Sequence, residues 1–432
     1  MNKIKQILVK NIWLKISIFN SSAVFVRIIS SWIINKFIAI YIGPEGTSIS
    51  EQFRNFLQTV QGISTLGTSE GVTRYSAKYQ NNKKQLTSFL ASTYKIVLIT
   101  SIVTGIFIIV FSDYFNQILF GERNYSTLII LLGVLLPVFS INVILLAILN
   151  GFQKYKKITY INIISNIIAA LLSWFLIVNY TITGALLLIL ITQIINFVAT
   201  LLLIKAEDFL NFSFSASKSS HYKRLYAYII MALVSAIIIP LSNILIRNLI
   251  FNHYTDDNGI HAGYWDGVKK ISGLLLTFVT PIFSLYYYPQ LAKIKTNKEF
   301  LNELKKFFKQ IFPLFFVVII LLYLFRHWAT IIFFSKEYIP MEKLFFWQLA
   351  GDFIRLISLS IAYLMLARAH IRYYISTEVL FWGVYYLFSY LLLPIYGVKG
   401  IVMAYFLTYI LYFFVIIILF KKVLFSKKNI FL

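Results

Sequence analysis

Long apolar stretches separated by short polar segments run through the whole chain. A helix needs about 20 mostly apolar residues to cross the hydrocarbon core, because lipid offers no partners to exposed backbone N–H and C=O groups. The pattern therefore predicts an all-α polytopic membrane protein with twelve transmembrane helices. The predicted spans cover residues 12–41, 53–72, 87–111, 126–149, 158–178, 182–204, 225–250, 263–288, 310–333, 344–366, 371–393 and 398–420. The second and the eighth are rich in Gly, Ser, Thr and Gln, which makes them the most polar.

The composition agrees with this pattern. Hydrophobic residues make up 59% of the chain and charged residues only 13%, with a mean hydropathy of +0.77. A soluble domain carries about 25% charged residues, so a water-soluble globular protein is excluded. Residues 1–10 lack a compact apolar core followed by a small-residue cleavage site. We therefore expect no cleavable signal peptide and a first helix that stays as an anchor.

The charge changes the picture only through its position. A net charge of +24, from 40 Lys and Arg against 16 Asp and Glu, would suggest a nucleic-acid partner in a soluble protein. Here the basic residues concentrate in the terminal tails and in the loops after the second, fourth, sixth, eighth and tenth spans. The positive-inside rule predicts that these segments and both termini are cytoplasmic, which excludes a nucleic-acid function. The opposite side carries most of the acids and few basic residues, namely Arg123, Arg247, Arg326, Lys336, Lys343 and Lys399.

The sequence also repeats at half its length. A shift of 216 residues places Tyr180 on Tyr396, Gly184 on Gly400 and Lys205 on Lys421, and so aligns the sixth span with the twelfth. Two halves of six helices enter the membrane in the same orientation, which predicts pseudo-twofold symmetry about the membrane normal and a pathway between the halves. We expect an N-terminal lobe over residues 1–210, a basic cytoplasmic linker over 211–224 and a C-terminal lobe over 225–432.

Several charged residues remain inside the predicted spans. Each charge at mid-bilayer depth costs at least about 2.5 to 3.5 kcal/mol, so these residues should face water or a partner. The basic residues suit an anionic substrate such as a phosphate or pyrophosphate, and the acidic residues are coupling or gating candidates. The candidate binding residues are Arg27, Lys36, Arg54, Lys269, Lys270 and Arg355, with Lys95 also inside a span. The coupling or gating candidates are Asp352, Glu378, Glu70 and Asp266, of which Asp266 lies near the outer mouth of its span.

Simpler interpretations compete with these roles. Lys36, Arg54 and Lys95 lie near helix ends, from which they could reach the interface with their long side chains. Asp352 and Arg355 are three residues apart on one helix face, so an ion pair within the helix is an alternative. Glu378 lies early enough in its span to face the cytoplasmic interface. No Gly-rich phosphate loop, cysteine or clustered histidine is present, so we predict no catalytic residue, no metal and no cofactor.

Short motifs in the same order over nearly the whole chain carry a family resemblance. They include Gly43-Pro44-Glu45-Gly46 with Phe53-Arg54, then Trp265-Asp266-Gly267-Val268, and then residues 346–352. With these motifs the chain resembles the flippases of lipid-linked oligosaccharides in O-antigen and enterobacterial common antigen assembly. These flippases belong to the multidrug/oligosaccharidyl-lipid/polysaccharide exporter superfamily. The Ile-, Phe- and Tyr-rich composition departs from the common-antigen pattern and leaves both glycans open.

The resemblance implies two six-helix lobes with alternating access. It also implies transport of an undecaprenyl-pyrophosphate-linked glycan from the cytoplasmic to the periplasmic leaflet of the bacterial inner membrane. A polysaccharide polymerase and chain-length machinery are implied partners. Energy would come from a proton gradient, a sodium gradient or consumption of the product.

Two alternatives come from other functional classes. An ion-coupled multidrug or metabolite antiporter of related architecture should carry mainly acidic groups in its cavity when its substrates are cations, whereas basic residues predominate here. A membrane glycosyltransferase or polymerase should carry a large outer loop with catalytic carboxylates. The longest predicted outer loop covers only residues 252–262, which disfavours that class.

Overall fold

A computed structural model of the chain describes residues 12–204, 220–255, 258–281, 283, 287, 290–291, 294, 296–367 and 370–425. Within these ranges, it leaves undescribed the side chains of residues 12–24, 70, 220–232, 278, 280–281 and 366–367. The described part is helical throughout and contains no β-strand. Helices satisfy their own backbone hydrogen bonds, as a chain in lipid requires.

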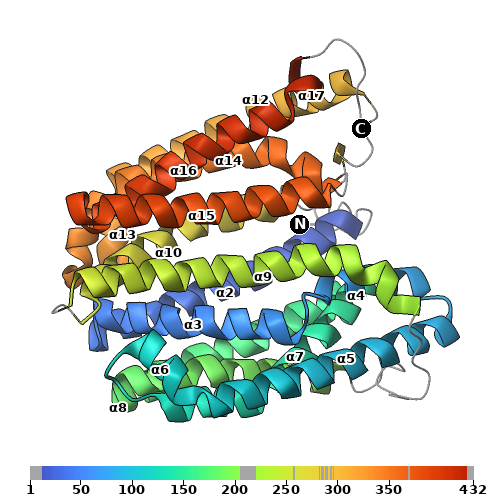
Figure 1. The fold of residues 1–432 in the computed structure, drawn as a ribbon, viewed down its shortest axis with the longest axis horizontal. Helices are drawn as coiled ribbons and strands as arrows, with labels where there is room; N and C mark the ends of the chain where they lie inside the picture. The colour runs from blue at the N-terminus through green and yellow to red at the C-terminus, as the bar shows by residue number, and fades with distance from the viewer. Residues whose placement is uncertain are drawn as a thin grey trace, which may run out of the picture. The chain divides into compact units, whose positions relative to one another are not determined.

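Each predicted span lies mostly within one or two helices of the described part (Figure 1), and the end of the eighth, residues 282, 284–286 and 288, lies outside the described residues. In the first half the long helices are α2 (Ile12–Tyr41), α3 (Pro44–Ser64), α5 (Lys83–Val110), α7 (Ser126–Gly151) and α8 (Tyr155–Ile204). In the second half they are α9 (Ser220–His253), α10 (Ile260–Pro281), α12 (Asn297–Leu324), α14 (Phe345–Ala367), α15 (Ile371–Tyr396) and α16 (Val398–Leu419). Shorter helices connect them, namely α4 (Ser69–Tyr79), α6 (Ser112–Phe120), α13 (Arg326–Phe333), the 3₁₀ helix η4 (Lys336–Leu344) and α17 (Lys421–Phe425).

Two spans differ in their bounds from the prediction. The second, predicted over 53–72, begins at Pro44 and breaks after Ser64, so that α3 and α4 replace one continuous helix. Leu66 and Gly67 adopt positive φ at the break, which an α-helix does not contain. The ninth begins earlier than predicted, at Asn297, because the first turns of α12 are amphipathic rather than apolar and were therefore missing from the hydropathy pattern.

Eight helices of the described part are long and apolar enough to cross a membrane by length and composition. They include the 50-residue α8, which covers the fifth and sixth predicted spans. The predicted intramembrane charges are spread over several helices. Arg27 and Lys36 are on α2, Arg54 is on α3, Glu70 is on α4, and Asp266, Lys269 and Lys270 are on α10, whereas Lys95 is on α5, Asp352 and Arg355 are on α14, and Glu378 is on α15.

The chain divides into two compact units. Unit 1 contains residues 1–42 and 52–241, and unit 2 contains residues 43–51 and 242–432. In unit 1, α2 packs along α8 and α5 packs along α7. In unit 2, α16 packs against both α14 and α15, and α10 packs against η4. The first two turns of α3 thus belong to unit 2 although they precede most of unit 1 in sequence.

The lobes 1–210 and 225–432 stay a prediction. Of the predicted linker 211–224, residues 211–219 lie outside the described residues, and residues 220–224 form the first turn of α9.

The repeat of 216 residues has a structural counterpart at the turn before each sixth helix. Thr181 breaks α8 with φ 49° and ψ −123°, and Gly397, which is 216 residues later, starts α16 with φ 61° and ψ −152°. The following glycines also correspond, because an added Cβ at Gly184 would meet the Leu176 carbonyl oxygen and one at Gly400 would meet the Leu392 carbonyl oxygen. The two halves therefore build this hairpin in the same way, which supports the repeat beyond shared apolar composition.

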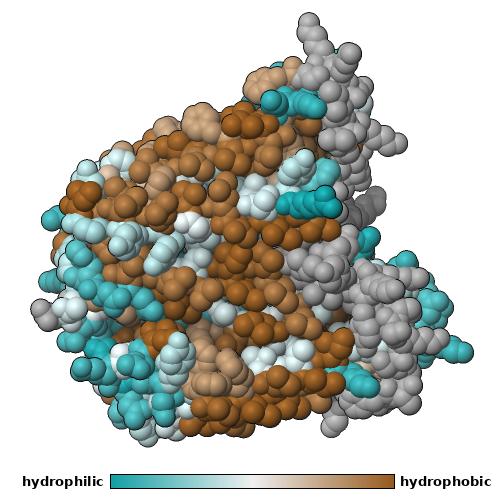
Figure 2. All heavy atoms as spheres, in the orientation of Figure 1, coloured by the Kyte–Doolittle hydropathy of each residue, from teal (hydrophilic) through white to brown (hydrophobic). Residues whose placement is uncertain are grey.

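The surface is that of a membrane protein. Figure 2 shows hydrophobic side chains over the middle of the helices, with hydrophilic side chains gathered toward helix ends on the face drawn. Large apolar residues on the helix surfaces are open, such as Val103 at 61%, Leu171 at 70% and Ile395 at 70% exposure. Lipid rather than water is the solvent in which such surfaces are stable.

Candidate functional site

The candidate cations of the first half lie on two helices of unit 1. Arg27 is exposed and Lys36 half-buried on α2, whereas Arg54 is exposed on α3. Glu70 lies in α4, and its side chain is outside the described part. Lys95 is exposed on α5. The expectation that Arg27, Lys36 and Arg54 line a cavity together with the second-half residues stays a prediction.

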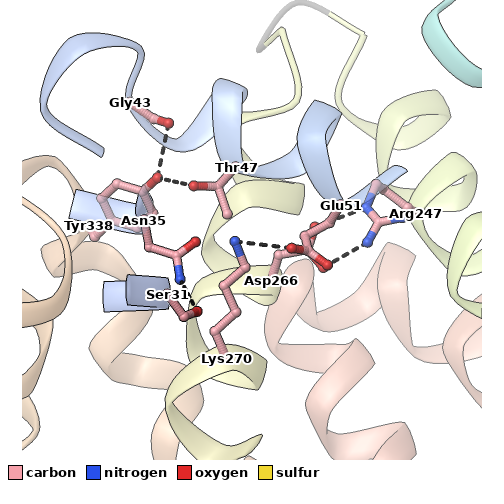
Figure 3. A network of polar contacts seen from close by, with 9 residues as sticks. All are labelled: Ser31, Asn35, Gly43, Thr47, Glu51, Arg247, Asp266, Lys270 and Tyr338. Carbon is pink, nitrogen blue, oxygen red and sulfur yellow. Dashed lines mark hydrogen bonds and ion pairs between the residues drawn. The ribbon is translucent and has the colours of Figure 1, made fainter. Parts of the chain in front are cut away.

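In unit 2, a buried ion pair joins α9 to α10. Arg247 Nε donates to Asp266 Oδ2 at 2.9 Å, and Arg247 Nη2 donates to Asp266 Oδ1 at 2.7 Å (Figure 3). Both side chains are buried, and the fork of the guanidinium matches the carboxylate in the bidentate geometry that makes such pairs strong. Asp266 was predicted as a coupling candidate, but Arg247 was placed among the basic residues of the outer side. Arg247 lies three residues before the end of the predicted span 225–250, and its position alone did not distinguish it from a residue at the outer interface.

Lys269 is held by neutral groups. Its ammonium donates to Asn243 Oδ1 at 2.8 Å and lies 3.8 Å from the centroid of the Trp265 ring, which is fully buried. A cation over an indole face is stabilised by the ring quadrupole without losing its charge. Since Asp266 is already paired with Arg247, no ion pair found among the described residues cancels the positive charge of Lys269.

Lys270 is held by a carboxylate instead. Its ammonium lies 3.1 Å from Glu51 Oε1, in the first two turns of α3 (Figure 3). Tyr338 of η4 fixes the start of the same segment. Its hydroxyl donates to the Gly43 carbonyl at 2.9 Å and lies 2.5 Å from Thr47 Oγ1. The sequence places Glu51 only among the acids of the outer side, so its role as the counter-ion of Lys270 comes from the tertiary structure.

A second polar cluster surrounds Asp352 on α14. Ser272 Oγ donates to Asp352 Oδ2 at 2.5 Å, and Tyr405 OH donates to Asp352 Oδ1 at 2.9 Å. Gln348 Nε2 donates to Ser272 Oγ at 3.2 Å. All four side chains are buried, so these hydrogen bonds offset the cost of removing the carboxyl from water.

Arg355, one turn after Asp352, is linked to it through a tyrosine. Arg355 Nη1 donates to Tyr405 OH at 3.3 Å, and its guanidinium carbon lies 5.8 Å from the Tyr409 ring centroid. None of the ion pairs found among the described residues joins Asp352 directly to Arg355. Arg355 Nε is buried and has no hydrogen-bond partner in the part of the chain that the structure describes. The alternative of an ion pair within the helix is thus replaced by a bridge through the Tyr405 hydroxyl.

Arg355 and Glu378 line one cavity inside unit 2. Its volume is about 260 Å³. Glu378, on α15, accepts from Trp382 Nε1 at 3.3 Å. The cavity thus offers one guanidinium and one carboxylate among tyrosine hydroxyls and apolar side chains. Its lining also includes Leu276, Phe283, Tyr363, Tyr374 and Tyr412.

A glycine allows the Tyr405 bridge to form. An added Cβ on Gly351 would lie 2.5 Å from Tyr405 Cδ1, so the ring packs directly on the backbone of α14. The motif Ala350-Gly351-Asp352 therefore has a local reason: Gly351 admits the ring, and Asp352 receives its hydroxyl. The motif is visible in the sequence, but the role of Tyr405 is not, because this residue lies on α16 and meets Asp352 only in the folded structure.

Two arrangements thus stand out in unit 2. One lies around α10 and consists of two ion pairs, Arg247 with Asp266 and Lys270 with Glu51, together with Lys269. The other is the cavity lined by Arg355 and Glu378. Within the part of the chain that is described, no group of three His, Asp or Glu side chains could hold a metal ion. Basic groups in a bundle of apolar helices are suited to binding an anionic group at membrane depth.

The fold is that of an all-α polytopic membrane protein. Three solved structures share the fold. An inward-facing multidrug resistance MATE family transporter of the MOP superfamily matches with a TM-score of 0.72 at 12% identity, over 92% of this chain and 96% of its own. The lipid II flippase MurJ in an inward closed conformation gives 0.66 at 17% identity, over 94% and 87%. A MOP superfamily transporter from Pyrococcus furiosus gives 0.64 at 11% identity, over 94% of each chain. The predicted fold class is confirmed.

Sequence comparison narrows the class to a family. The family model for polysaccharide biosynthesis proteins matches residues 13–295, and the chain belongs to that family. Lipid III flippases from Escherichia coli (strain K12) and Shigella flexneri are each 28% identical to it over 404 residues. These alignments cover 92% of this chain and 96% of each flippase. The resemblance stated from short motifs is therefore confirmed.

Proposed function

We propose that the chain is a flippase for a lipid-linked oligosaccharide, and that it moves an undecaprenyl-pyrophosphate-linked O-antigen or common-antigen repeat unit. The observation that supports this most is the 28% identity to the lipid III flippases over nearly the full length of both proteins. A match of that extent includes both halves of the repeat. It is therefore not explained by a few shared apolar helices.

The orientation follows from the charge distribution. Basic tails and basic loops place both termini in the cytoplasm by the positive-inside rule, and the substrate then moves from the cytoplasmic to the periplasmic leaflet of the bacterial inner membrane. The protein acts as a transporter and not as an enzyme, without a cofactor. A polysaccharide polymerase and chain-length machinery would receive the product.

The proposed mechanism separates the parts of the substrate. The polyprenyl tail stays in lipid, while the pyrophosphate and the sugars pass through a polar pathway. Burying a pyrophosphate without partners is prohibitive, and cationic side chains at membrane depth reduce that cost. Of the predicted cations in unit 2, Lys269 and Arg355 best suit this role, because Lys270 is already paired with Glu51. Arg27, Lys36 and Arg54 would supply the cations of the other half.

Coupling to an ion gradient is a separate proposal. Asp352 is a buried carboxyl with ready donors in Ser272 and Tyr405, and Glu378 lines the cavity with Arg355. Either could exchange a proton or bind a monovalent cation. Glu70 and Asp266 were also candidates, but Asp266 is better placed to hold Arg247 than to exchange an ion.

An ion-coupled multidrug or metabolite antiporter is the second candidate function. The cavity in unit 2 favours it to the extent that Glu378 gives the lining a carboxylate that would attract a cation. The two functions differ in the substrate that Arg355 would meet, since a guanidinium repels a cationic drug and binds a phosphate.

Flipping in proteoliposomes tests the proposal. The purified protein is reconstituted with lipid-linked oligosaccharide, and the fraction accessible in the outer leaflet is followed with time. We expect flipping by the wild type and a strong reduction in Arg27→Ala, Lys269→Ala and Arg355→Ala. Undiminished flipping in all three variants would rule out the cationic pathway, and transport of a cationic dye without lipid flipping would favour the antiporter. Asp352→Asn, assayed with and without a proton or sodium gradient, tests the coupling.

A further inference from the structure

The relationship between Asp352, Tyr405 and Arg355 has a consequence for the cavity. Asp352 and Arg355 are three residues apart on α14, a spacing at which opposite charges on a helix pair directly. In a low-dielectric interior such a pair is strongly attractive. Yet in this structure the Tyr405 hydroxyl lies between them, donating to Asp352 Oδ1 at 2.9 Å and accepting from Arg355 Nη1 at 3.3 Å.

The position of Tyr405 leaves one side of Arg355 available. Nη1 is used by Tyr405, whereas Nε is buried with no hydrogen-bond partner among the described residues, and the side chain lines the cavity of about 260 Å³. Nε and the neighbouring Nη2 form the edge by which a guanidinium binds a carboxylate or phosphate in a bidentate manner. An unpaired buried donor is costly, and an anionic oxygen that entered the cavity beside this edge would give Nε a partner.

We propose that Tyr405 is a positioning residue that keeps Arg355 in the cavity, by occupying the carboxylate oxygen of Asp352 that Arg355 would otherwise bind. The ligand of Arg355 is an anion with phosphoryl or carboxylate oxygens. In the proposed function, on which this identity rests, that anion is the pyrophosphate or an acidic sugar of the substrate.

Removal of the Tyr405 hydroxyl should move Arg355 out of the cavity. Tyr405→Phe keeps the ring that packs on Gly351 but removes the spacer, so Arg355 falls onto Asp352 and leaves the cavity. Anion binding then weakens about tenfold or more, since a charge-assisted bidentate contact is lost. Replacing Asp352 as well, in Tyr405→Phe with Asp352→Asn, removes the competing carboxylate and restores binding. A second acceptor, Glu378, also lies on the cavity, so Tyr405→Phe with Glu378→Gln is the parallel variant, which should not restore binding.

Binding to the purified protein in detergent measures this without transport. Isothermal titration calorimetry at constant ionic strength uses two probes, inorganic pyrophosphate and D-glucuronate, which distinguish a phosphoryl ligand from a sugar carboxylate. The matched control is Tyr287→Phe, which also removes a buried hydroxyl, one that donates to the Ser360 carbonyl at 2.8 Å. We expect wild-type affinity in the control. Thermal unfolding of each variant in detergent separates lost binding from lost folding.

The outcomes are distinct. The spacer role is established if Tyr405→Phe loses anion binding and adding Asp352→Asn restores it, whereas adding Glu378→Gln does not. Three results would overturn the spacer role. The first is that Tyr405→Phe binds the probes as well as the control does, and the second is that adding Asp352→Asn does not recover the lost binding. The third is that the wild type binds neither probe. Because flipping is measured separately, a failed flippase assay with intact Tyr405 behaviour overturns only the proposed function.

Discussion

Arg247 and Asp266 form a bidentate ion pair at 2.7 and 2.9 Å that is buried between α9 and α10. The pair fixes the helix that also presents Trp265, Lys269 and Lys270, so the orientation of these cations depends on it. A buried ion pair contributes little net stability over an apolar pair, but a single buried charge without its partner is very unfavourable.

We therefore expect asymmetric effects of substitution at this pair. Arg247→Leu or Asp266→Leu alone leaves one buried charge and lowers the free energy of unfolding by about 3 to 5 kcal/mol. The double variant with Leu at both positions should be close to the wild type. Thermal unfolding in detergent, read by fluorescence-detected size exclusion, checks this. Additive losses in the double variant would show that the two side chains do not act as a pair.

The two adjacent lysines of α10 should contribute differently to transport. Lys269 is held by Trp265 and Asn243, both neutral, whereas the charge of Lys270 is cancelled by Glu51. Lys269→Met should therefore reduce flipping much more than Lys270→Met at equal protein level. Lys269→Arg is the control that keeps the charge and should retain flipping. Equal losses for the two Met variants would contradict this assignment.

The turn before the sixth helix stores backbone strain. Thr181 adopts φ 49° and ψ −123°, a conformation that is natural only for glycine, and the repeat has Gly397 at the equivalent place. Thr181→Gly should raise the free energy of unfolding by about 1 kcal/mol. Thr183→Gly, two residues on and within the helix, is the matched control and should not stabilise. A lower melting temperature for Thr181→Gly would show that Thr181 is not strained.

Gly351 should tolerate no side chain. Its missing Cβ leaves room for the Tyr405 ring, so Gly351→Ala pushes the ring away and separates the hydroxyl from Asp352. Overpacking of this kind costs about 1 to 3 kcal/mol, and we expect weaker anion binding as well. Gly273→Ala and Gly383→Ala are controls at helical glycines with open space around them. The melting temperatures of these controls should equal or exceed that of the wild type. A wild-type melting temperature for Gly351→Ala would show that the Tyr405 ring can move aside.

Much of the architecture was predictable from local pattern. Spans such as 371–393 and 398–420 are mostly apolar, and α15 and α16 occupy them almost to the residue. The second span was misplaced because α3 is polar, with Glu51 and Arg54 within it. Its polar face is matched by partners such as Lys270, which no local window can include.

The sequence by itself determined the class of protein, the positions of its helices, the repeat and the set of charges that lipid would not tolerate. These properties follow from the free energy of placing each residue in hydrocarbon, which is local and nearly additive. Only the tertiary structure decided which charges are cancelled and which are available. Each pairing depends on atoms from different helices coming within hydrogen-bonding distance. The pairs are Arg247 with Asp266, Lys270 with Glu51, and Asp352 with Arg355 through Tyr405. That distance is set by packing, for example by the missing side chain of Gly351.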